Sequence, residues 1–525
     1  MAKIAYILLC HKDPDAIIAQ AERLTAAGDC MAIHFDASAS ARDFDRIQTA
    51  LKSNPNVTFA ARRIKCGWGE WSLVQATLNA VHAAVDAFPR ATHFYMLSGD
   101  CMAIKTAEYA HRLLDETDKD FIESHDFFES DWIKTGMKED RLIYRHYFNE
   151  RTQSKLFYAA YEAQKRLGLT REIPEDLQIM IGSQWWCLRR RTIEMILDFL
   201  RQRRDVVRFF STTWIPDETF FQTLVRHLIP KTEIENRTLT FLMFSDYGMP
   251  VTFYNDHYDL LLTQDYLFAR KISPEAQLLK QKLGALYASE GVEFQISNEG
   301  RNLHGFLTGR GRVGRRYAPR FWETANTLGA DRDLYMVVCK KWHVAKRLID
   351  QIASETNLPC IEYLFNEETA PLPDLGGLET TLVKRSRHRR AVTRMLYDHF
   401  GTDRLLICLD PASLDIVQDF CSDKARTHVL EIECTYSDAY LVGHAIRVGL
   451  AGENSPAATV ERLLPTIRSD LAYESEQLRG AGIERFFRLR ETADPAENVA
   501  AIAGFLGVSE ETAQSIMRLD YLFTD

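Results

Sequence analysis

The sequence predicts an α/β protein with more than one domain, and three observations support this prediction. The chain has 525 residues, whereas a single hydrophobic core usually stops growing at about 250 to 300 residues. Hydrophobic residues make up 46% of it and charged residues 26%, which suits packed cores and excludes a disordered chain. Apolar runs of strand length alternate with amphipathic helical patterns near the N-terminus, and the same alternation begins again at Asp333.

The N-terminal alternation predicts a parallel sheet flanked by helices. In chain order we expect a strand at 4–9, a helix at 16–27, a strand at 31–35, a helix from 43, a strand at 57–60, a helix at 72–88 capped by Ser72, and a strand at 92–97. Ligands of such sheets bind outside the carboxyl ends of the strands. Binding residues are therefore expected in Cys10–Lys12, at Asp36 and in Ser98–Cys101.

The rest of the chain predicts a connector and a second domain. Residues 110–180 are mostly helical in pattern, 178–189 and 239–244 are strand candidates, and 213–227 suggest a loop and a helix. We expect a first domain at 1–297, a glycine- and arginine-rich connector at 298–330 and a second, three-layer α/β domain at 331–525. The second domain is expected to contain strands at 334–339, 360–364, 405–409 and 429–432 and helices at 342–356, 389–400, 413–421 and 498–506.

Composition narrows the function classes. The formal net charge is -9 and the connector has few aromatics, so its six arginines favour a phosphate clamp or a basic surface over a nucleic-acid arm. No segment reaches the roughly eighteen unbroken apolar residues of a membrane span. A strand that starts at Ile4 leaves no room for a leader peptide, and the ten cysteines form no CxxC pair. We expect a cytoplasmic protein with reduced thiols and neither a zinc site nor a nucleic-acid partner.

Eight short strings follow one another in the first half of the chain. They are Ala5–Pro14 (AYILLCHKDP), Ile33–Asp36 (IHFD), Trp68–Gly69 with Ser72, Leu97–Gly99 with Ile104–Lys105, Phe121–Glu123 (FIE), Gly182–Trp186 (GSQWW), Pro216–Glu218 (PDE) and Leu267–Lys271 (LFARK). Over about residues 3–275 they resemble glycosyltransferase family 14, the core-2/I-branching β-1,6-N-acetylglucosaminyltransferases and peptide O-xylosyltransferases. The resemblance implies a GT-A-like fold, a UDP-sugar donor, inversion at the anomeric carbon and no requirement for a metal ion.

Glu218 is the candidate catalytic base. An inverting transfer needs a carboxylate that takes the proton of the attacking acceptor hydroxyl, and Glu218 matches the position of the family's base. Asp217 precedes it and is a candidate contact of the acceptor. An acidic pair at the start of a helix is in most proteins explained by the helix dipole alone. The matched string favours the catalytic role for Glu218.

Arg270 and Lys271 are the candidate cations for the departing diphosphate, since they match the basic end of the family's string. Lys271 is the stronger candidate of the two, and Arg237 is a weaker one by position. An Arg-Lys pair after an apolar run is otherwise usually a solvated end of a helix or strand.

Three further candidates for the donor site lie at predicted strand ends. His11 and Asp36 occupy the places where a uridine would bind, and the Asp36 carboxylate could accept a hydrogen bond from the uracil or the ribose. A single His or Asp in such a turn more often forms hydrogen bonds within its own loop. Asp100 provides a single carboxylate, too few for a hard cation. The family usually has an acidic residue at the position of Cys101. Asp100 therefore either takes the role of that acid from the preceding position or caps the turn after the strand.

Glu123, Trp185 and Trp186 are the candidate acceptor and sugar contacts. An indole face suits the apolar face of a sugar ring, and a carboxylate accepts hydrogen bonds from hydroxyls. Adjacent residues on a strand point to opposite sides, so at most one of the two tryptophans faces the site and the other belongs to the core.

The second domain gives a weaker pattern. It weakly resembles a sulfotransferase, whose phosphate loop would correspond to a strand, the turn Lys340–Lys341 and a helix from Trp342. The weak likeness extends to Leu409–Pro411 and to a final helix before Gly507. No Gly-x-x-x-x-Gly-Lys string is present, so a divergent or inactive domain is favoured.

Together these observations predict an inverting transferase that moves GlcNAc or xylose from a UDP-sugar to a hydroxyl of a glycan or glycoconjugate. It would need no cofactor and could serve surface polysaccharide synthesis. The alternative is a non-catalytic scaffold that binds a nucleotide or polyanion. The oligomeric state is left open.

Overall fold

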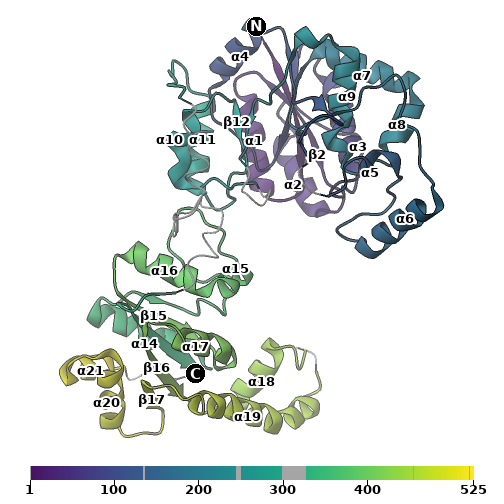
Figure 1. The fold of residues 1–525 in the computed structure, drawn as a ribbon. Helices are drawn as coiled ribbons and strands as arrows, with labels where there is room; N and C mark the ends of the chain where they lie inside the picture. The colour runs from purple at the N-terminus through teal and green to yellow at the C-terminus, as the bar shows by residue number, and fades with distance from the viewer. Residues whose placement is uncertain are drawn as a thin grey trace. The chain divides into compact units, whose positions relative to one another are not determined.

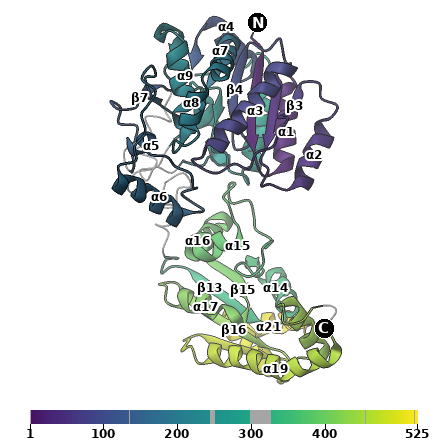
Figure 2. The same cartoon turned by 90° about the vertical axis from the view of Figure 1, so that its right-hand side faces the viewer.

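The computed structural model describes residues 2–133, 136–243, 250–297, 327–452, 455–519 and 521–524. The chain divides into two compact units, Met1–Leu307 and Thr308–Asp525 (Figures 1 and 2). All six arginines of the predicted connector fall outside the described residues. Both units contain sheets flanked by helices, which confirms the predicted α/β fold class.

The first unit is built on a seven-stranded mixed sheet with the strand order β10-β6-β9-β4-β1-β2-β3. Its strands are β1 (Ile4–Cys10), β2 (Cys30–Phe35), β3 (Val57–Phe59), β4 (His93–Ser98), β6 (Asp120–Phe121), β9 (Cys187–Arg189) and β10 (Ile234–Glu235). β3, β2, β1 and β4 run parallel, whereas β9 is antiparallel to β4. The carboxyl ends of β1, β2 and β4 therefore lie at one edge of the sheet.

Helices lie on both faces of this sheet, because α1 and α2 connect β1, β2 and β3 in one direction across the sheet and α3 returns from β3 to β4 in the other. α1 and α2 pack against each other, while α3 packs on β1, β2 and β3 and contacts the turn η1 (Figure 2). The helices and turns of the unit are α1 (Pro14–Thr25), α2 (Ala41–Leu51), α3 (Trp71–Ala87), α4 (Ala107–Glu116), α5 (Asp140–Ile143), α6 (Ser154–Leu167), α7 (Arg190–Gln202), α8 (Arg204–Phe210), η1 (Pro216–Glu218), α9 (Phe220–Leu228), η2 (Lys231–Glu233), η3 (Asn255–His257), α10 (Tyr258–Leu262) and α11 (Gln277–Tyr287).

Two local predictions were wrong. Ser72 does not cap α3, because the helix starts at Trp71 with Glu70 at its N-cap, and the Ser72 hydroxyl instead accepts a hydrogen bond from the Gly67 amide at 2.9 Å. The strand expected at 178–189 is two short strands, β8 (Met180–Ile181) and β9, with a turn between them.

Two further small sheets complete the first unit. β8 pairs with β7 (His125–Asp126). β12 (Phe268–Ala269) lies between β11 (Thr240–Phe241) and β5 (Met102–Ala103), and the register pairs Ala269 with Met102. This pairing brings the residues after β12 to the loop that follows β4.

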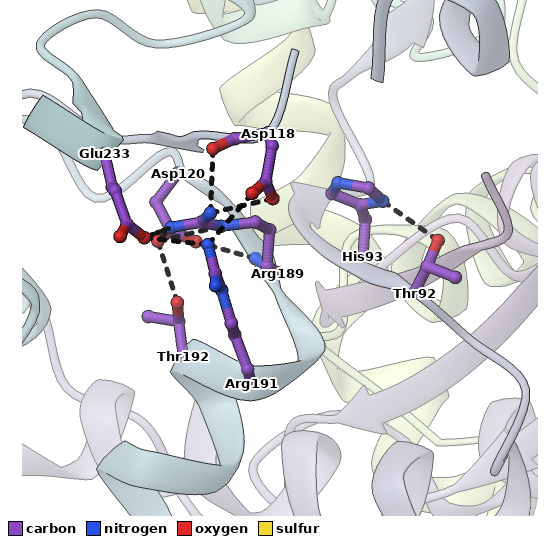
Figure 3. Close-up of polar contacts among 8 residues, drawn as sticks. All are labelled: Thr92, His93, Asp118, Asp120, Arg189, Arg191, Thr192 and Glu233. Atoms are coloured by element: carbon purple, nitrogen blue, oxygen red, sulfur yellow. Dashed lines mark hydrogen bonds and ion pairs between the residues drawn. The ribbon is translucent and has the colours of Figure 1, made fainter. Parts of the chain in front are cut away.

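A buried ionic network holds the sheet together at the edge opposite the carboxyl end of β4 (Figure 3). The Arg189 guanidinium contacts Asp120 and Glu233 at 2.8 Å each and Asp118 at 2.8 Å. Thr192 donates a hydrogen bond to the Asp120 carboxylate at 2.7 Å. Each buried charge is therefore compensated, as a structural role requires.

α11 is tied to the sheet by a chain of buried polar groups. The hydroxyls of Tyr6 on β1 and Tyr287 on α11 share a hydrogen bond, and Tyr287 donates to the Asp29 carboxylate at 2.7 Å. Asp29 also lies 2.9 Å from the His111 ring. This chain fixes a helix that lies more than 250 residues after β1 in the sequence.

The second unit contains a five-stranded parallel sheet with the order β14-β15-β13-β16-β17. Its strands are β13 (Asp333–Cys339), β14 (Cys360–Ile361), β15 (Arg404–Leu409), β16 (Arg426–Glu433) and β17 (Phe486–Arg490). Its helices and turn are α14 (Trp342–Thr356), α15 (Leu382–Arg387), α16 (Arg389–Phe400), η4 (Pro411–Ser413), α17 (Leu414–Cys421), α18 (Asp438–Arg447), α19 (Ala457–Arg479), α20 (Pro495–Leu506) and α21 (Glu510–Ile516). In the described part of the chain, no helix combines the length and apolar composition of a membrane span.

Candidate active site

A cavity of about 630 Å³ opens at the carboxyl ends of β1 and β4, within the usual size range of ligand pockets. Three segments that are distant in sequence form most of its wall, namely residues 9–13, 98–102 and 270–272. The pairing of β12 with β5 brings the last of them to the cavity. α1, α11 and Pro274 supply the remaining side chains. The predicted residues His11, Asp100, Arg270 and Lys271 all line this cavity.

The cavity wall is rich in cations. Apart from His11, its basic side chains are Lys12, Arg23, Arg270, Lys271 and Lys280, and its acidic side chains are Asp13, Asp15 and Asp100. The Asp100 carboxylate lies 3.6 Å from the Lys12 ammonium and 3.7 Å from that of Lys271. Asp100 thus orders two cations around the cavity, which is suited to a ligand with more than one negative charge. Among the described residues, no group of three or more His, Cys, Asp or Glu side chains is arranged to hold a metal ion.

Arg237 and Asp36 do not line this cavity. Arg237 forms an ion pair with Asp265 at 2.8 Å. The Asp36 carboxylate accepts hydrogen bonds from the amide and hydroxyl of Ser38, at 2.7 and 2.6 Å, and from the Cys66 amide at 3.1 Å. Burial favours the neutral acid, but these hydrogen bonds outweigh it, so the pKa of Asp36 is lowered. In this structure Asp36 therefore organises the loop after β2.

Trp185 and Trp186 are both buried, at 4% and 1% exposure, in the turn between β8 and β9. Trp186 packs in the core against Phe221, with ring centroids 4.9 Å apart. The Arg270 guanidinium lies 4.2 Å from the centre of the Trp185 ring. Trp185 thus holds a cation of the cavity wall through a cation–π contact. Because Arg270 covers this face of the ring, the face is not open to a sugar in this structure.

Glu218 lies in η1, where Arg141 and Trp132 hold its carboxylate. The Arg141 guanidinium donates to it at 3.1 Å, and the Trp132 side chain forms a second hydrogen bond. Burial raises the pKa of Glu218, while Arg141 and Trp132 oppose that rise. The Arg141 side chain is only 9% exposed, against 32% for Glu218. A carboxylate with a buried cation on one side and partial solvent access on the other is suited to accept a proton.

Asp217 lies beside Glu218 but faces protein interior. Its Oδ1 atom is buried and has no hydrogen-bond partner among the described residues. Burial, and then the charge of Glu218, raises the pKa of Asp217 to about 7. Asp217 therefore keeps its proton to a higher pH than an ordinary aspartate, in part because of the charge on Glu218.

Gly182 joins Glu123 to the Glu218 turn. The Gly182 amide donates to the Glu218 carbonyl at 2.9 Å, and a Cβ atom at position 182 would lie 2.0 Å from the Glu123 carbonyl oxygen. Only glycine permits this approach. The Glu123 carboxylate accepts a hydrogen bond from the Ser183 amide at 3.3 Å. One turn, residues 182–186, therefore connects Glu123, Glu218 and, through Trp185, Arg270.

Sequence reasoning missed three residues of this region. Lys12 lies at a predicted strand end that gave it no specific role, and Lys280 on α11 belongs to no matched string. Arg141 lies in a helical stretch rich in charges, where nothing in the pattern distinguishes a buried arginine from a solvated one. Only the tertiary structure brings Arg141 to Glu218.

In the second unit, ion pairs occupy the place where the likeness to a phosphate loop was expected. The ammonium of Lys340, after β13, lies 3.0 Å from Asp410 and 2.8 Å from Glu474. The Trp342 indole also donates to Asp410, at 2.8 Å. Two carboxylates thus occupy the side of Lys340 that a phosphate would need.

Two families match the chain. The Core-2/I-branching enzyme family matches residues 4–260, and a family of unknown function (DUF5928) matches residues 270–525. A β-1,3-galactosyl-O-glycosyl-glycoprotein β-1,6-N-acetylglucosaminyltransferase 3 of Ovis aries is 23% identical over 228 residues, which are 42% of this chain and 47% of that protein.

Two xylosyltransferases are also similar to the same half. One, from Ciona intestinalis, is 27% identical over 175 residues, 33% of this chain and 19% of that protein. Xylosyltransferase 2 of Canis lupus familiaris is 26% identical over 235 residues, 43% of this chain and 24% of that protein. The chain spans less than half the length of each of these relatives. The mixed sheet, the ordered motifs and the family match show that residues 4–260 form a Core-2/I-branching enzyme domain, of glycosyltransferase family 14.

Proposed function

We propose that the first unit is an inverting, metal-independent glycosyltransferase that moves GlcNAc or xylose from a UDP-sugar to a hydroxyl of a glycan or glycoconjugate. One observation carries the proposal. The turn formed by residues 182–186 contacts both the wall of the cation-lined cavity, at Arg270, and Glu218, whose carboxylate the Arg141 guanidinium binds. The similar proteins include transferases of both sugars by name.

In the proposed reaction the acceptor hydroxyl gives its proton to Glu218 while its oxygen forms a bond to the anomeric carbon. The bond from that carbon to the diphosphate breaks, and UDP leaves with the electron pair. Arg270 and Lys271, with Lys12, stabilise the charge that develops on the diphosphate. Fixed cations fit the metal independence of family members, since they supply the same stabilisation.

UDP release from a panel of UDP-sugars, with and without EDTA and with candidate acceptors, tests this proposal. We expect release from one donor that EDTA does not inhibit and that Glu218→Gln abolishes without a large change in UDP affinity. Glu235→Gln, on the sheet edge, is the matched control. Bound UDP with no release from any donor–acceptor pair would instead favour the nucleotide-binding scaffold.

The proposal includes a cytoplasmic location and a role in assembling a surface polysaccharide. All ten cysteines are free thiols in the structure, which is usual for proteins of the cytoplasm. Cell fractionation with an antibody to the native protein tests the location.

A further inference from the structure

The helix α6 is poorly covered by the rest of the first unit. It has 14 residues, and of their side chains only Phe157 and Tyr161 are buried. Figures 1 and 2 show the helix at the periphery of the unit, on the side of α5. A helix of this length is marginal in water by itself, and most helices in proteins are held by a broad apolar face that packs on a core. Most of the surface of α6 therefore has no partner within the unit.

Exposed apolar side chains are concentrated at this helix. Among the described residues of the first unit, ten large hydrophobic side chains are exposed, and five of them lie within residues 147–169. These five are Tyr147, Leu156, Tyr158, Leu167 and Leu169, with exposed fractions between 43% and 69%. Single exposed apolar residues are ordinary on protein surfaces, whereas a concentration of them in one place marks an interaction surface.

The helical spacing gathers the two leucines of the outer face into one stripe. Leu156, Ala159, Ala163 and Leu167 follow one another at intervals of three and four residues, which places them on the same face of α6. All four are exposed, and the two buried aromatic side chains of the helix lie on a different face. The helix thus has one narrow apolar stripe toward the core and a second one toward solvent.

Cations surround the outer stripe. Four basic side chains are exposed between residues 151 and 166, namely Arg151, Lys155, Lys165 and Arg166, and the one exposed acidic side chain in that stretch is Glu162. Among the described residues, none of the four cations forms an ion pair with a carboxylate. The chain as a whole has a formal net charge of -9, so the sign of the charge is locally reversed here.

This combination fits a phospholipid surface better than a protein partner. Helices that lie in a membrane interface present leucine and aromatic side chains to the acyl boundary, with lysine and arginine beside them for anionic headgroups. Tyrosine is enriched at that boundary, and two of the five exposed apolar side chains are tyrosines. The cores of protein interfaces, in contrast, are depleted in lysine.

The α6 segment is attached to the chain that leads to Glu218. Before the helix, the His146 amide donates to the Thr212 carbonyl at 2.8 Å. After the helix, the Arg171 guanidinium donates to the hydroxyls of Thr212 and Thr213, at 2.6 and 2.8 Å. A surface bound through α6 would therefore have a fixed position relative to the Glu218 turn.

We propose that α6, with Tyr147 and Leu169, docks the first unit on the anionic phospholipid surface of a membrane. The leucine stripe enters the headgroup region, and the four cations contact the lipid phosphates. The contact is peripheral and reversible. Under the proposed function, which the docking surface does not require, this contact brings the transferase to acceptors that are carried on lipid.

Two double variants test the surface. Leu156→Gln with Leu167→Gln removes the apolar stripe, and Lys155→Gln with Arg166→Gln removes two cations beside it. All four side chains are exposed, so both proteins should fold like the wild type, which circular dichroism verifies.

Matched controls make the same changes at exposed positions outside the segment. They are Met195→Gln with Leu278→Gln for the leucines, and Arg42→Gln with Lys52→Gln for the cations. Co-sedimentation of the full chain with vesicles measures the partition coefficient, without any sugar donor. One set of vesicles contains phosphatidylcholine alone, and the other an equal mixture of phosphatidylcholine and phosphatidylglycerol.

We expect the wild type to bind the mixed vesicles, to bind the neutral ones far more weakly, and to dissociate as salt is added. One lysine or arginine near an anionic surface strengthens binding about fivefold, so the charge variant should bind about 10- to 30-fold more weakly. The leucine variant should lose about 10-fold or more, since two apolar side chains no longer enter the interface. The controls should bind like the wild type.

Absence of wild-type binding to the mixed vesicles overturns the proposal, and so does a loss of binding that is as large in the controls as in the α6 variants. Sedimentation equilibrium tests the competing occupant, a second copy of the chain. Self-association that the leucine variant abolishes, without vesicle binding, would assign the stripe to that copy and overturn membrane docking. Because vesicle binding needs no donor, its outcome is independent of the outcome for UDP-sugar turnover.

Discussion

Replacement of Arg141 by methionine isolates what the buried cation does for Glu218. The two groups are 3.1 Å apart, and methionine fills similar space without charge. An opposite charge at this range lowers a carboxyl pKa by about 1 to 3 units. Because the Glu218 side chain is 32% exposed and solvent screens part of the attraction, we take the lower half of that range.

The pKa of Glu218 should therefore rise by about 1 to 2 units in Arg141→Met, equivalent to about 1.4 to 2.7 kcal/mol. A base is active when ionised, so the acid limb of kcat/KM against pH should move upward by the same amount. On that limb the rate should fall about 10- to 100-fold and should recover at higher pH. Arg141→Lys, which keeps the charge, should shift the limb less.

Transfer rates measured across pH, with circular dichroism to verify folding, decide the matter. Arg203→Met removes an arginine from an exposed pair with Asp176 and serves as the control. A folded Arg141→Met protein whose acid limb stays in place would refute the reasoning. A uniform loss at every pH would show that Arg141 positions the carboxylate and does not tune it.

Three further predictions concern other charges. Asp217 has a pKa of about 7 and is still protonated where Glu218 ionises, so Asp217→Asn should leave the acid limb of kcat/KM in place, and a shift of about 1 unit or more in the same profile would contradict this. Lys271→Met should raise the Kd for UDP about 10- to 100-fold by calorimetry, since a charge-assisted contact is lost, whereas an unchanged Kd would place the diphosphate elsewhere. Burial lowers the pKa of His93 to about 4, below the 6.5 of the unfolded chain, so the free energy of unfolding should fall by about 3 kcal/mol as the pH falls from about 6.5 to 4. Urea midpoints measured across this pH range should show the fall, and His93→Gln should remove most of it.

The regular elements were the most predictable part of the fold. The helices expected at 342–356 and 389–400 have those bounds in the structure, because their apolar spacing and end residues are local signals. The loops after β1 and β4 meet at one cavity, as their strand ends predicted, whereas Asp36 after β2 lies outside it and Arg270 and Lys271 after β12 were predicted from the matched string alone. The order of the strands and the short strand β14 depend on contacts between distant segments, which no local pattern contains.

Individual side-chain environments were less predictable. The Asp36 carboxylate is satisfied by Ser38 and Cys66, and the position of Cys66, thirty residues later, follows only from the packed loop. The face of Trp185 is covered by Arg270, which arrives through the β5–β12 pairing. A motif thus indicated which residues lie near the site, but the partners that determine their chemistry are set by tertiary structure.

The wall of the cation-lined cavity crosses the border between the two matched families. Lys12 and Asp100 precede residue 260, whereas Arg270, Lys271 and Lys280 belong to the segment that the family of unknown function covers. The hydrogen bond from Tyr6 to Tyr287 crosses the same border. Truncation of the chain there would separate residues that line one cavity. An expression clone of the first unit must therefore extend past Tyr287.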